Sequence, residues 1–294
     1  MPAHTAPHFG SSRWRRVVVA TYRAFFDPDT SLRCAGTAFF SFMSLFPAVG
    51  IVATTYGLIA DRSTLEATID ALQYVLPSAV LSILQEQLRI LISQPASTLG
   101  VGLIISVLLA LWSGSRGVSA LIYAMSRVRK EPERRSFFKA LGVAIGLTIG
   151  GAIFLTVALV TIAGLPALLP FPTGSDWMVL ALRWPILLLL STLVIGALFR
   201  WGPDRHPRRF RYIWPGAVLA SLLWIVAGAV FSIYVENYSN YQATFGSITA
   251  AVVLLLWIYN SAQILVLGAA INAAIEASSP SAAATRATIA VQRR

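Results

Sequence analysis

Charged, histidine and cysteine residues are scarce in this sequence, and their scarcity argues against most soluble and metal-dependent classes of protein. Only 12% of the 294 residues are charged, whereas soluble domains usually carry about 25%. The histidines, His4, His8 and His206, are scattered, and the single cysteine, Cys34, can form no internal disulfide. Without a histidine or cysteine cluster, the sequence predicts no metal site and no cofactor.

Common catalytic motifs are also lacking. The sequence has no G-x-x-x-x-G-K-[ST] phosphate loop and no G-x-S-x-G nucleophile turn. Gly100-Val101-Gly102 lacks the third glycine and the preceding strand of a dinucleotide site. No nucleophile has an evident base beside it, so we expect no catalytic residues and predict that the protein is not an enzyme.

Long apolar runs dominate what is present. Hydrophobic residues make up 56% of the sequence, and the mean hydropathy is +0.71. Runs of about 20 apolar residues without alternation are typical of membrane-spanning helices. The sequence therefore predicts an all-α, polytopic integral membrane protein. In a membrane protein, basic residues reflect the orientation of the spans, so the net charge of +11 does not indicate a nucleic-acid partner, and none is expected.

Six spans are expected, with amphipathic helices over residues 63–94 between the first and second. Residues 1–32 form a cytoplasmic arm, 33–276 the membrane domain and 277–294 a cytoplasmic tail. The arm contains a basic amphipathic segment, 13–26, which fits either a surface helix or an ordinary juxtamembrane arm. The expected spans are 33–60, 98–126, 137–165, 177–199, 214–236 and 246–275.

Lysine and arginine are distributed unevenly between the two sides of these spans. Nineteen lie in the arm together with Arg33 directly after it, the 126–139 and 200–214 loops and the tail, against two in the intervening loops. Basic residues collect on the cytoplasmic side, so both termini are predicted to be cytoplasmic. Arg116 and Arg183 are left within spans.

Arg116 is the main candidate for a functional residue, because a charge inside an apolar helix is costly and normally has a partner or a role. Gly114 and Gly117 flank it, and Trp112 lies one turn earlier. The small residues place Arg116 beside a close helix contact. Its side chain either extends (snorkels) toward the cytoplasmic interface or binds an anionic group such as a lipid phosphate. Arg116 is then either packed against a partner or part of the wall of a cavity.

Several other polar or helix-bending residues lie within spans. Arg183 is expected to pair with Glu236 or to contact lipid headgroups. The amides of Asn260, Gln263 and Asn272 fit either hydrogen bonds between helices or a polar pathway. Pro47 predicts a kink that is either a hinge or a static bend. Gly142, Gly146 and Gly150 recur every four residues, which predicts a close helix-packing face.

Several segments together resemble one family. FFSFMSLFP, LWSGSRG, FRWGPDR with WPGAVLASLLW, and YQATFGSITAAVVLLLWIY with LGAAINA are similar to the YihY/BrkB family, once labelled ribonuclease BN. The resemblance covers about residues 15–276 and implies a six-helix protein of the bacterial inner membrane. Many members carry a glutamate where this chain has Ala270, and an apolar residue where it has Asn260. Any role of that glutamate is absent here or moved to Asn260 or Asn272.

Three functions are weighed on these grounds. The first is transport or lipid handling without ATP, with an anionic, amphipathic substrate at Arg116 and anionic membrane lipids as partners. The second is a scaffold for envelope assembly, which leaves open a homo-oligomer or an envelope protein as partner. The third, a ribonuclease, fits poorly, because phosphodiester cleavage needs metal ligands or an acid–base pair.

Overall fold

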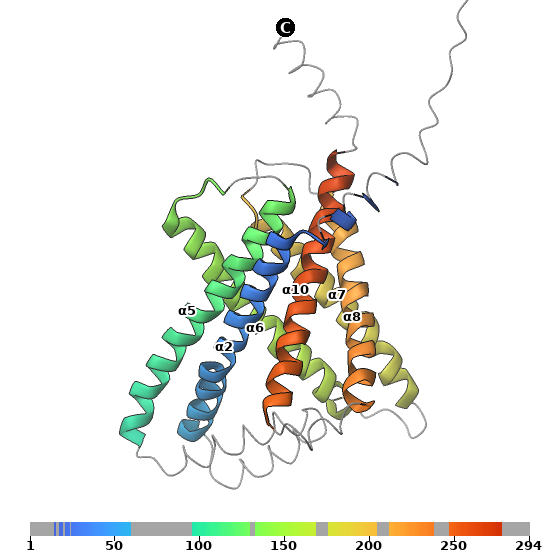
Figure 1. Ribbon diagram of the computed structural model, residues 1–294. Coiled ribbons are helices and arrows are strands. Elements are labelled where there is room, and N and C mark those ends of the chain that lie inside the picture. The colour runs from blue at the N-terminus through green and yellow to red at the C-terminus, as the bar shows by residue number, and fades with distance from the viewer. Residues whose placement is uncertain are drawn as a thin grey trace, which may run out of the picture.

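The computed structural model shows a bundle of long helices (Figure 1). The residues that it describes are 15, 18–19, 21–23, 25–59, 96–129, 133–168, 176–204, 212–237 and 247–277. Their long helices are α2 (Pro28–Ile59), α5 (Ala96–Arg129), α6 (Phe137–Leu168), α7 (Asp176–Trp201), α8 (Trp214–Asn237) and α10 (Ser247–Ala277).

Each of these six helices contains a stretch that is long and apolar enough to cross a membrane. The shortest stretch, Trp184–Trp201, has 18 residues, or about 27 Å at 1.5 Å per residue, close to the hydrocarbon thickness of about 30 Å. The prediction of an all-α protein with six spans is confirmed. The start of α2 and the end of α10 lie at the same end of the bundle (Figure 1).

The six helices close into a ring in chain order. Each helix packs against the next along the chain, and α10 returns to pack against α2, with a further contact to α5. The α2–α5 pair has the most extensive contact of all. This pair carries Arg116, so its packing fixes where that side chain lies.

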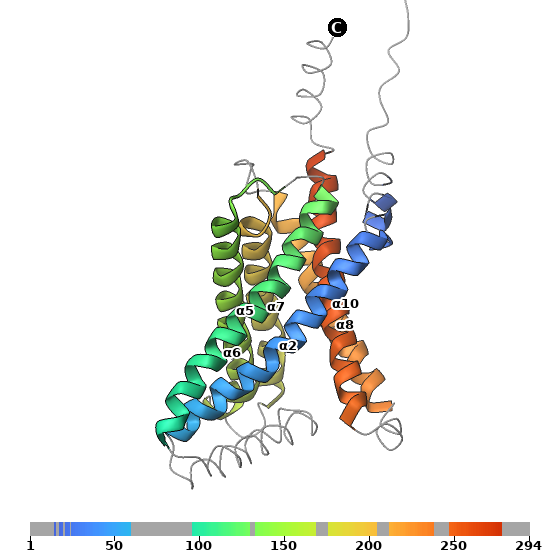
Figure 2. The ribbon, with the colours of Figure 1, turned by 60° about the vertical axis from the view of Figure 1, so that its left-hand side comes forward.

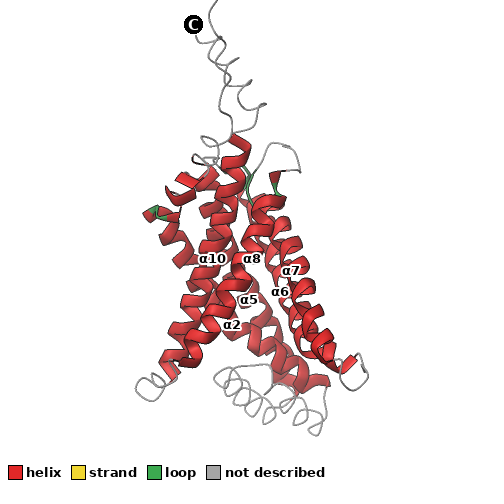
Figure 3. Cartoon of the chain, turned by 90° about the vertical axis from the view of Figure 1, so that its right-hand side faces the viewer, coloured by secondary structure: helices red, strands yellow, loops and turns green. Residues whose placement is uncertain are grey.

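The packing is uneven along the bundle axis. The buried apolar core gathers near the end where α2 begins and α10 ends, and includes Cys34, Met125, Phe199, Ala217 and Val266. Toward the opposite end, α2 and α5 diverge from α8 and α10 (Figures 2 and 3). We call the first end the packed end and the second the splayed end.

Local chemistry explains where α2 starts. The Asp27 Oδ2 atom accepts hydrogen bonds from Thr30 N at 3.1 Å and from Thr30 Oγ1 at 2.9 Å. Asp27 is therefore an N-cap, and Pro28 occupies the first helical position, where its missing N–H does no harm. The helix begins at Pro28 rather than near Arg33, where the apolar run begins.

The predicted packing role of Gly142, Gly146 and Gly150 is not met within the described part of the chain. A Cβ atom added at any of the three would meet no atom within 4 Å. The physical reason is their place on α6. The face that packs into the bundle carries the buried Ala144 and the half-buried Thr148, and the glycine stripe lies on the opposite side of the helix.

Two predicted surface elements lie wholly or partly outside the described residues. The amphipathic helices expected over 63–94 lie outside the described residues. Of the segment 13–26, the described residues include Thr21, Tyr22, Arg23 and Phe25, which are helical.

Candidate functional site

The contact between α2 and α5 depends on small residues. A Cβ at Gly117 would lie 2.9 Å from Ser41 Oγ and 3.4 Å from the Thr37 carbonyl oxygen of α2. A Cβ at Gly114 would lie 2.7 Å from the Thr148 methyl of α6. Both glycines are buried, so they let α5 approach α2 and α6 closely on either side of position 116.

Arg116 lies on the outer face of α5. Its side chain is exposed, and so is Trp112 one turn away, at 56%. The Trp112 ring packs edge-on against Phe40 of α2, with 6.5 Å between the ring centroids. Arg116 forms no ion pair or hydrogen bond with any residue that the structure describes. The close helix contact thus turns Arg116 outward, toward the lipid side of the bundle.

The same face continues toward the packed end with further cations and aromatic rings. The guanidinium carbon of Arg33 lies 5.9 Å from the centre of the Tyr123 ring, within the range of a cation–π interaction. At the end of α5, Arg127 Nη2 donates to Asp29 Oδ2 at 2.9 Å, with both side chains 58% exposed. Together with Arg116, Trp112 and Phe40, these residues form a stripe that we call the α2–α5 face.

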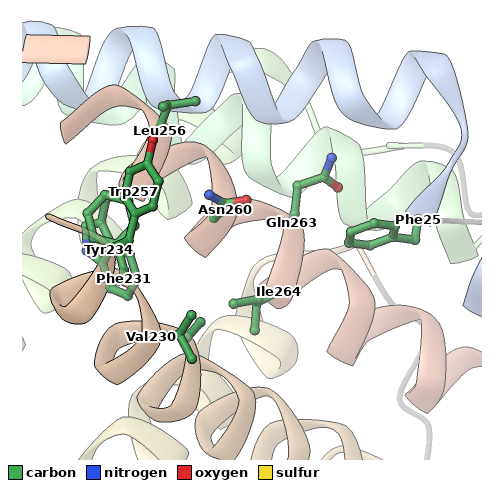
Figure 4. A pocket seen from close by; sticks show the side chains of 10 residues that line it. Phe25, Val230, Phe231, Tyr234, Leu256, Trp257, Asn260, Gln263 and Ile264 are labelled. Atoms are coloured by element: carbon green, nitrogen blue, oxygen red, sulfur yellow. The ribbon is translucent and has the colours of Figure 1, made fainter. Parts of the chain in front are cut away.

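Asn260 and Gln263 line a pocket between α8 and α10 (Figure 4). Its volume is about 380 Å³, and Phe25, which precedes α2, lies beside Gln263. Asn260 is exposed, whereas Gln263 is buried. Gln263 Nε2 donates to Tyr259 Oη at 2.8 Å and to Ser31 Oγ at 3.3 Å. The second bond joins α10 to α2.

Asn272 is fully buried and ties two helices together. Its Oδ1 atom accepts from Gly216 N at 2.7 Å, and its Nδ2 atom donates to the Ile213 carbonyl at 2.9 Å. Gly216 lies in the first turn of α8, where backbone N–H groups have no partner within the helix. Asn272, on α10, therefore caps the start of α8. Of the two predicted roles, its contacts fit hydrogen bonds between helices and not a polar pathway.

The remaining candidates can be placed only in part. Arg183 lies in α7 and Glu236 in α8, but their side chains are outside the described residues, so the expected pairing stays a prediction. Pro47 lies inside α2, which continues as one helix to Ile59. Whether Pro47 acts as a hinge also stays a prediction.

Comparison with known proteins decides the family. The model of the family described as virulence factor BrkB matches residues 21–290, which includes all six spans. The chain belongs to the BrkB family.

Of three relatives of this BrkB-family chain, two are named as membrane proteins and one as ribonuclease-like. A Bacillus subtilis protein named as ribonuclease-like, YfkH, is 30% identical over 82% of this chain and 88% of its own length. A UPF0761 membrane protein of Idiomarina loihiensis is 26% identical over 61% of each chain. Another UPF0761 membrane protein, from Kangiella koreensis, is 25% identical over 87% of this chain and 63% of its own length. No solved structure matches.

Ala270, the position where the resemblance implied a glutamate in many members, is buried at 3% exposure on α10. Asn272, two residues later, already uses its amide oxygen and nitrogen to cap α8. Asn260 faces the α8–α10 pocket instead. Of the two asparagines, only Asn260 is exposed, and it alone could contact a ligand.

One largely buried ion pair of the BrkB-family chain has no counterpart among the predictions from the sequence. Arg129 Nη2 donates to Glu276 Oε2 at 2.9 Å, with side-chain exposures of 3% and 15%. The pair joins the last turns of α5 and α10 at the packed end. No local signal identifies it, because the two residues are 147 positions apart and each resembles an ordinary charge at the end of a span.

Loop residues at the same end are also held by specific contacts. Arg135 donates to the carbonyl oxygens of Gly202 at 2.8 Å and Pro203 at 3.1 Å. Its Nε atom lies 3.4 Å from Asp204 Oδ1. These contacts hold the segment before α6 against the segment after α7. Arg135, which the sequence shows only as one of the basic residues that orient the spans, therefore also stabilises the packed end.

Proposed function

We propose that this BrkB-family protein handles anionic, amphipathic lipids in the bacterial inner membrane without ATP hydrolysis, with both termini in the cytoplasm. The α2–α5 face binds the headgroup, and Arg116 contacts its phosphate. Support for the location comes from the lysine and arginine distribution, which favours cytoplasmic termini. The family and its UPF0761 relatives support a membrane protein.

The observation that carries the proposal is the outward position of Arg116 within a span. A cation on the lipid side of a span is costly unless it snorkels to the interface or meets an anion. Along the helix, Arg116 is roughly 15 Å from Arg127, the basic residue near the end of the span. A phosphate oxygen brought to Arg116 would satisfy its forked donors, which bind phosphate in bidentate fashion.

The neighbouring residues fit a headgroup path rather than a catalytic site. Tyr123 is an aromatic residue of the kind that lies at the boundary between headgroups and acyl chains, and Trp112 places a second aromatic ring beside Arg116, one turn deeper in the span. Arg33 and Arg127 supply further positive charge toward the packed end. No step of the proposal breaks a covalent bond, and the described side chains around Arg116 offer no nucleophile paired with a base. We therefore propose a non-enzymatic role.

Lipid translocation in proteoliposomes tests the proposal. Purified protein is reconstituted with phosphatidylglycerol carrying a fluorescent, reducible headgroup label, and the rate at which inner-leaflet label becomes reducible is measured. A charge-assisted hydrogen bond contributes about 1.5–3 kcal/mol, so Arg116→Ala should slow the rate about tenfold or more. The rate of Arg116→Lys should fall between those of wild type and Arg116→Ala, because lysine keeps the positive charge but lacks the forked donors of arginine.

Lys139→Ala is the matched control, since it removes an exposed positive charge from α6, outside the α2–α5 face. It should change the rate by less than about twofold, the size of effect expected for an exposed charge away from the contact. Equal rates for wild type and Arg116→Ala would favour simple snorkelling or a scaffold and would remove the proposal. A rate no higher than that of empty vesicles would do the same.

A further inference from the structure

The α8–α10 pocket lies apart from the α2–α5 face and has a different chemistry. Its apolar walls come from both helices and include Val230, Phe231, Leu256 and Trp257. None of the ten described lining residues carries a full charge at neutral pH. A volume of about 380 Å³ is within the range of sites for small organic ligands, about 300–1,000 Å³.

Two amide side chains interrupt these apolar walls. Asn260 lies between Trp257 and Gln263, and its carboxamide is exposed in the pocket (Figure 4). It makes no hydrogen bond with any described residue, although it lies within the span Ala251–Ala277. A polar amide left without a partner in an apolar medium is unfavourable. A ligand that bonds to Asn260 would remove this cost.

Gln263 provides a second and independent sign of a missing partner. Only 6% of the residue is exposed, and its Oε1 atom accepts no hydrogen bond from the residues that the structure describes. Its Nε2 atom bonds to two hydroxyl groups, those of Ser31 and Tyr259. A hydroxyl can donate or accept, so one end of this amide stays unpartnered in either orientation.

The polar and apolar parts of the pocket are ordered along the bundle axis. Gln263 is joined to Ser31, in the first turn of α2, and therefore lies toward the packed end. Leu256 lies about 10 Å farther toward the splayed end, by the rise of α10. A ligand would thus place its polar group near the two amides and its apolar body toward the splayed end, between α8 and α10.

We propose that this pocket binds a neutral lipid whose polar group is a hydroxyl, at a site separate from Arg116. The hydroxyl bonds to the exposed carboxamide of Asn260, next to Gln263, and the acyl chain lies between α8 and α10. A charged headgroup is disfavoured, because the pocket offers it no counter-charge in a low-dielectric setting. This site is independent of the headgroup contact proposed above.

Tryptophan fluorescence of the full-length protein in detergent tests the proposal. The probe is a diacylglycerol with brominated acyl chains, which quenches an indole that it contacts, and Trp257 lines the pocket. Wild type should show saturable quenching. Loss of one net hydrogen bond corresponds to about a three- to tenfold weaker apparent affinity, and we expect this for Asn260→Leu. Ala227→Phe, which fills the pocket from α8, should abolish saturation.

Two controls separate the proposed contact from general effects. Thr156→Leu makes a similar polar-to-apolar change on the exposed face of α6 and should leave the affinity unchanged. A brominated fatty-acid methyl ester, which has no donor, should bind wild type as weakly as the diacylglycerol binds Asn260→Leu. The proposal is overturned if Asn260→Leu keeps the wild-type affinity for the brominated diacylglycerol, or if the methyl ester binds wild type as tightly as the diacylglycerol does. It is also overturned if wild type shows no saturable quenching.

Discussion

Gly268 provides a quantitative test of how tightly α8 and α10 are packed. A Cβ at this position would lie 2.8 Å from the Gly216 carbonyl oxygen, 2.8 Å from Ala220 Cβ and 3.0 Å from Phe199 Cζ. Optimal contacts between carbon atoms are about 3.5–4.0 Å. Neither the carbonyl oxygen nor the alanine Cβ can rotate away, so Gly268→Ala requires α8 and α10 to separate by roughly half an ångström or more.

The free energy of unfolding should fall as a result. Overpacking typically costs about 1–3 kcal/mol, and the shift also strains the bond between Gly216 and Asn272, which contributes about 1 kcal/mol. Alanine gains about 1 kcal/mol over glycine in a helix interior. We therefore expect a net loss of about 1–3 kcal/mol for Gly268→Ala, combining these terms.

Reversible unfolding in mixed detergent and sodium dodecyl sulfate micelles measures this difference. Gly146→Ala is the matched control, because it makes the same change in an exposed helical glycine with open space around it. It should be neutral or more stable by up to about 1 kcal/mol, the propensity difference alone. The reasoning fails if Gly268→Ala is as stable as Gly146→Ala.

Two further predictions concern polar contacts at the packed end. Asn272→Leu removes the partner of Gly216 N and leaves buried backbone groups without hydrogen bonds, so it should lower the free energy of unfolding by about 2–5 kcal/mol. The same unfolding assay would contradict this if the variant matched wild type. Arg129→Ala leaves Glu276 as a buried, uncompensated charge and should cost about 3–5 kcal/mol. Arg127→Ala breaks only an exposed pair and should cost less than about 1 kcal/mol; similar losses in the two arginine variants would refute the distinction.

The six spans could be predicted because each is long, apolar and bounded by charges or loop residues. The apolar run begins only near Cys34 and predicts a span from residue 33, whereas helix α2 already begins at Pro28. The Asp27-Pro28 pair is a local capping signal that marks the true start. Reading caps together with hydropathy would have found this boundary.

Contacts between distant segments could not be derived in the same way. Glycine spacing predicts that a face is available for close packing, but not that a helix occupies it. The regular stripe on α6 lies open, whereas single glycines at 216 and 268 make a tight crossing. Likewise, nothing local distinguishes Asn272, which caps α8, from Asn260, which faces a pocket.

The central claim, that Arg116 binds the phosphate of an anionic lipid, is tested most directly by an electron cryo-microscopy structure of the protein in nanodiscs containing phosphatidylglycerol. The account predicts phosphate density within hydrogen-bond distance of the Arg116 guanidinium, with the headgroup near Trp112 and Tyr123. Density for ordered lipids elsewhere around the bundle but none at Arg116, or an Arg116 side chain bound only to protein groups, would contradict it.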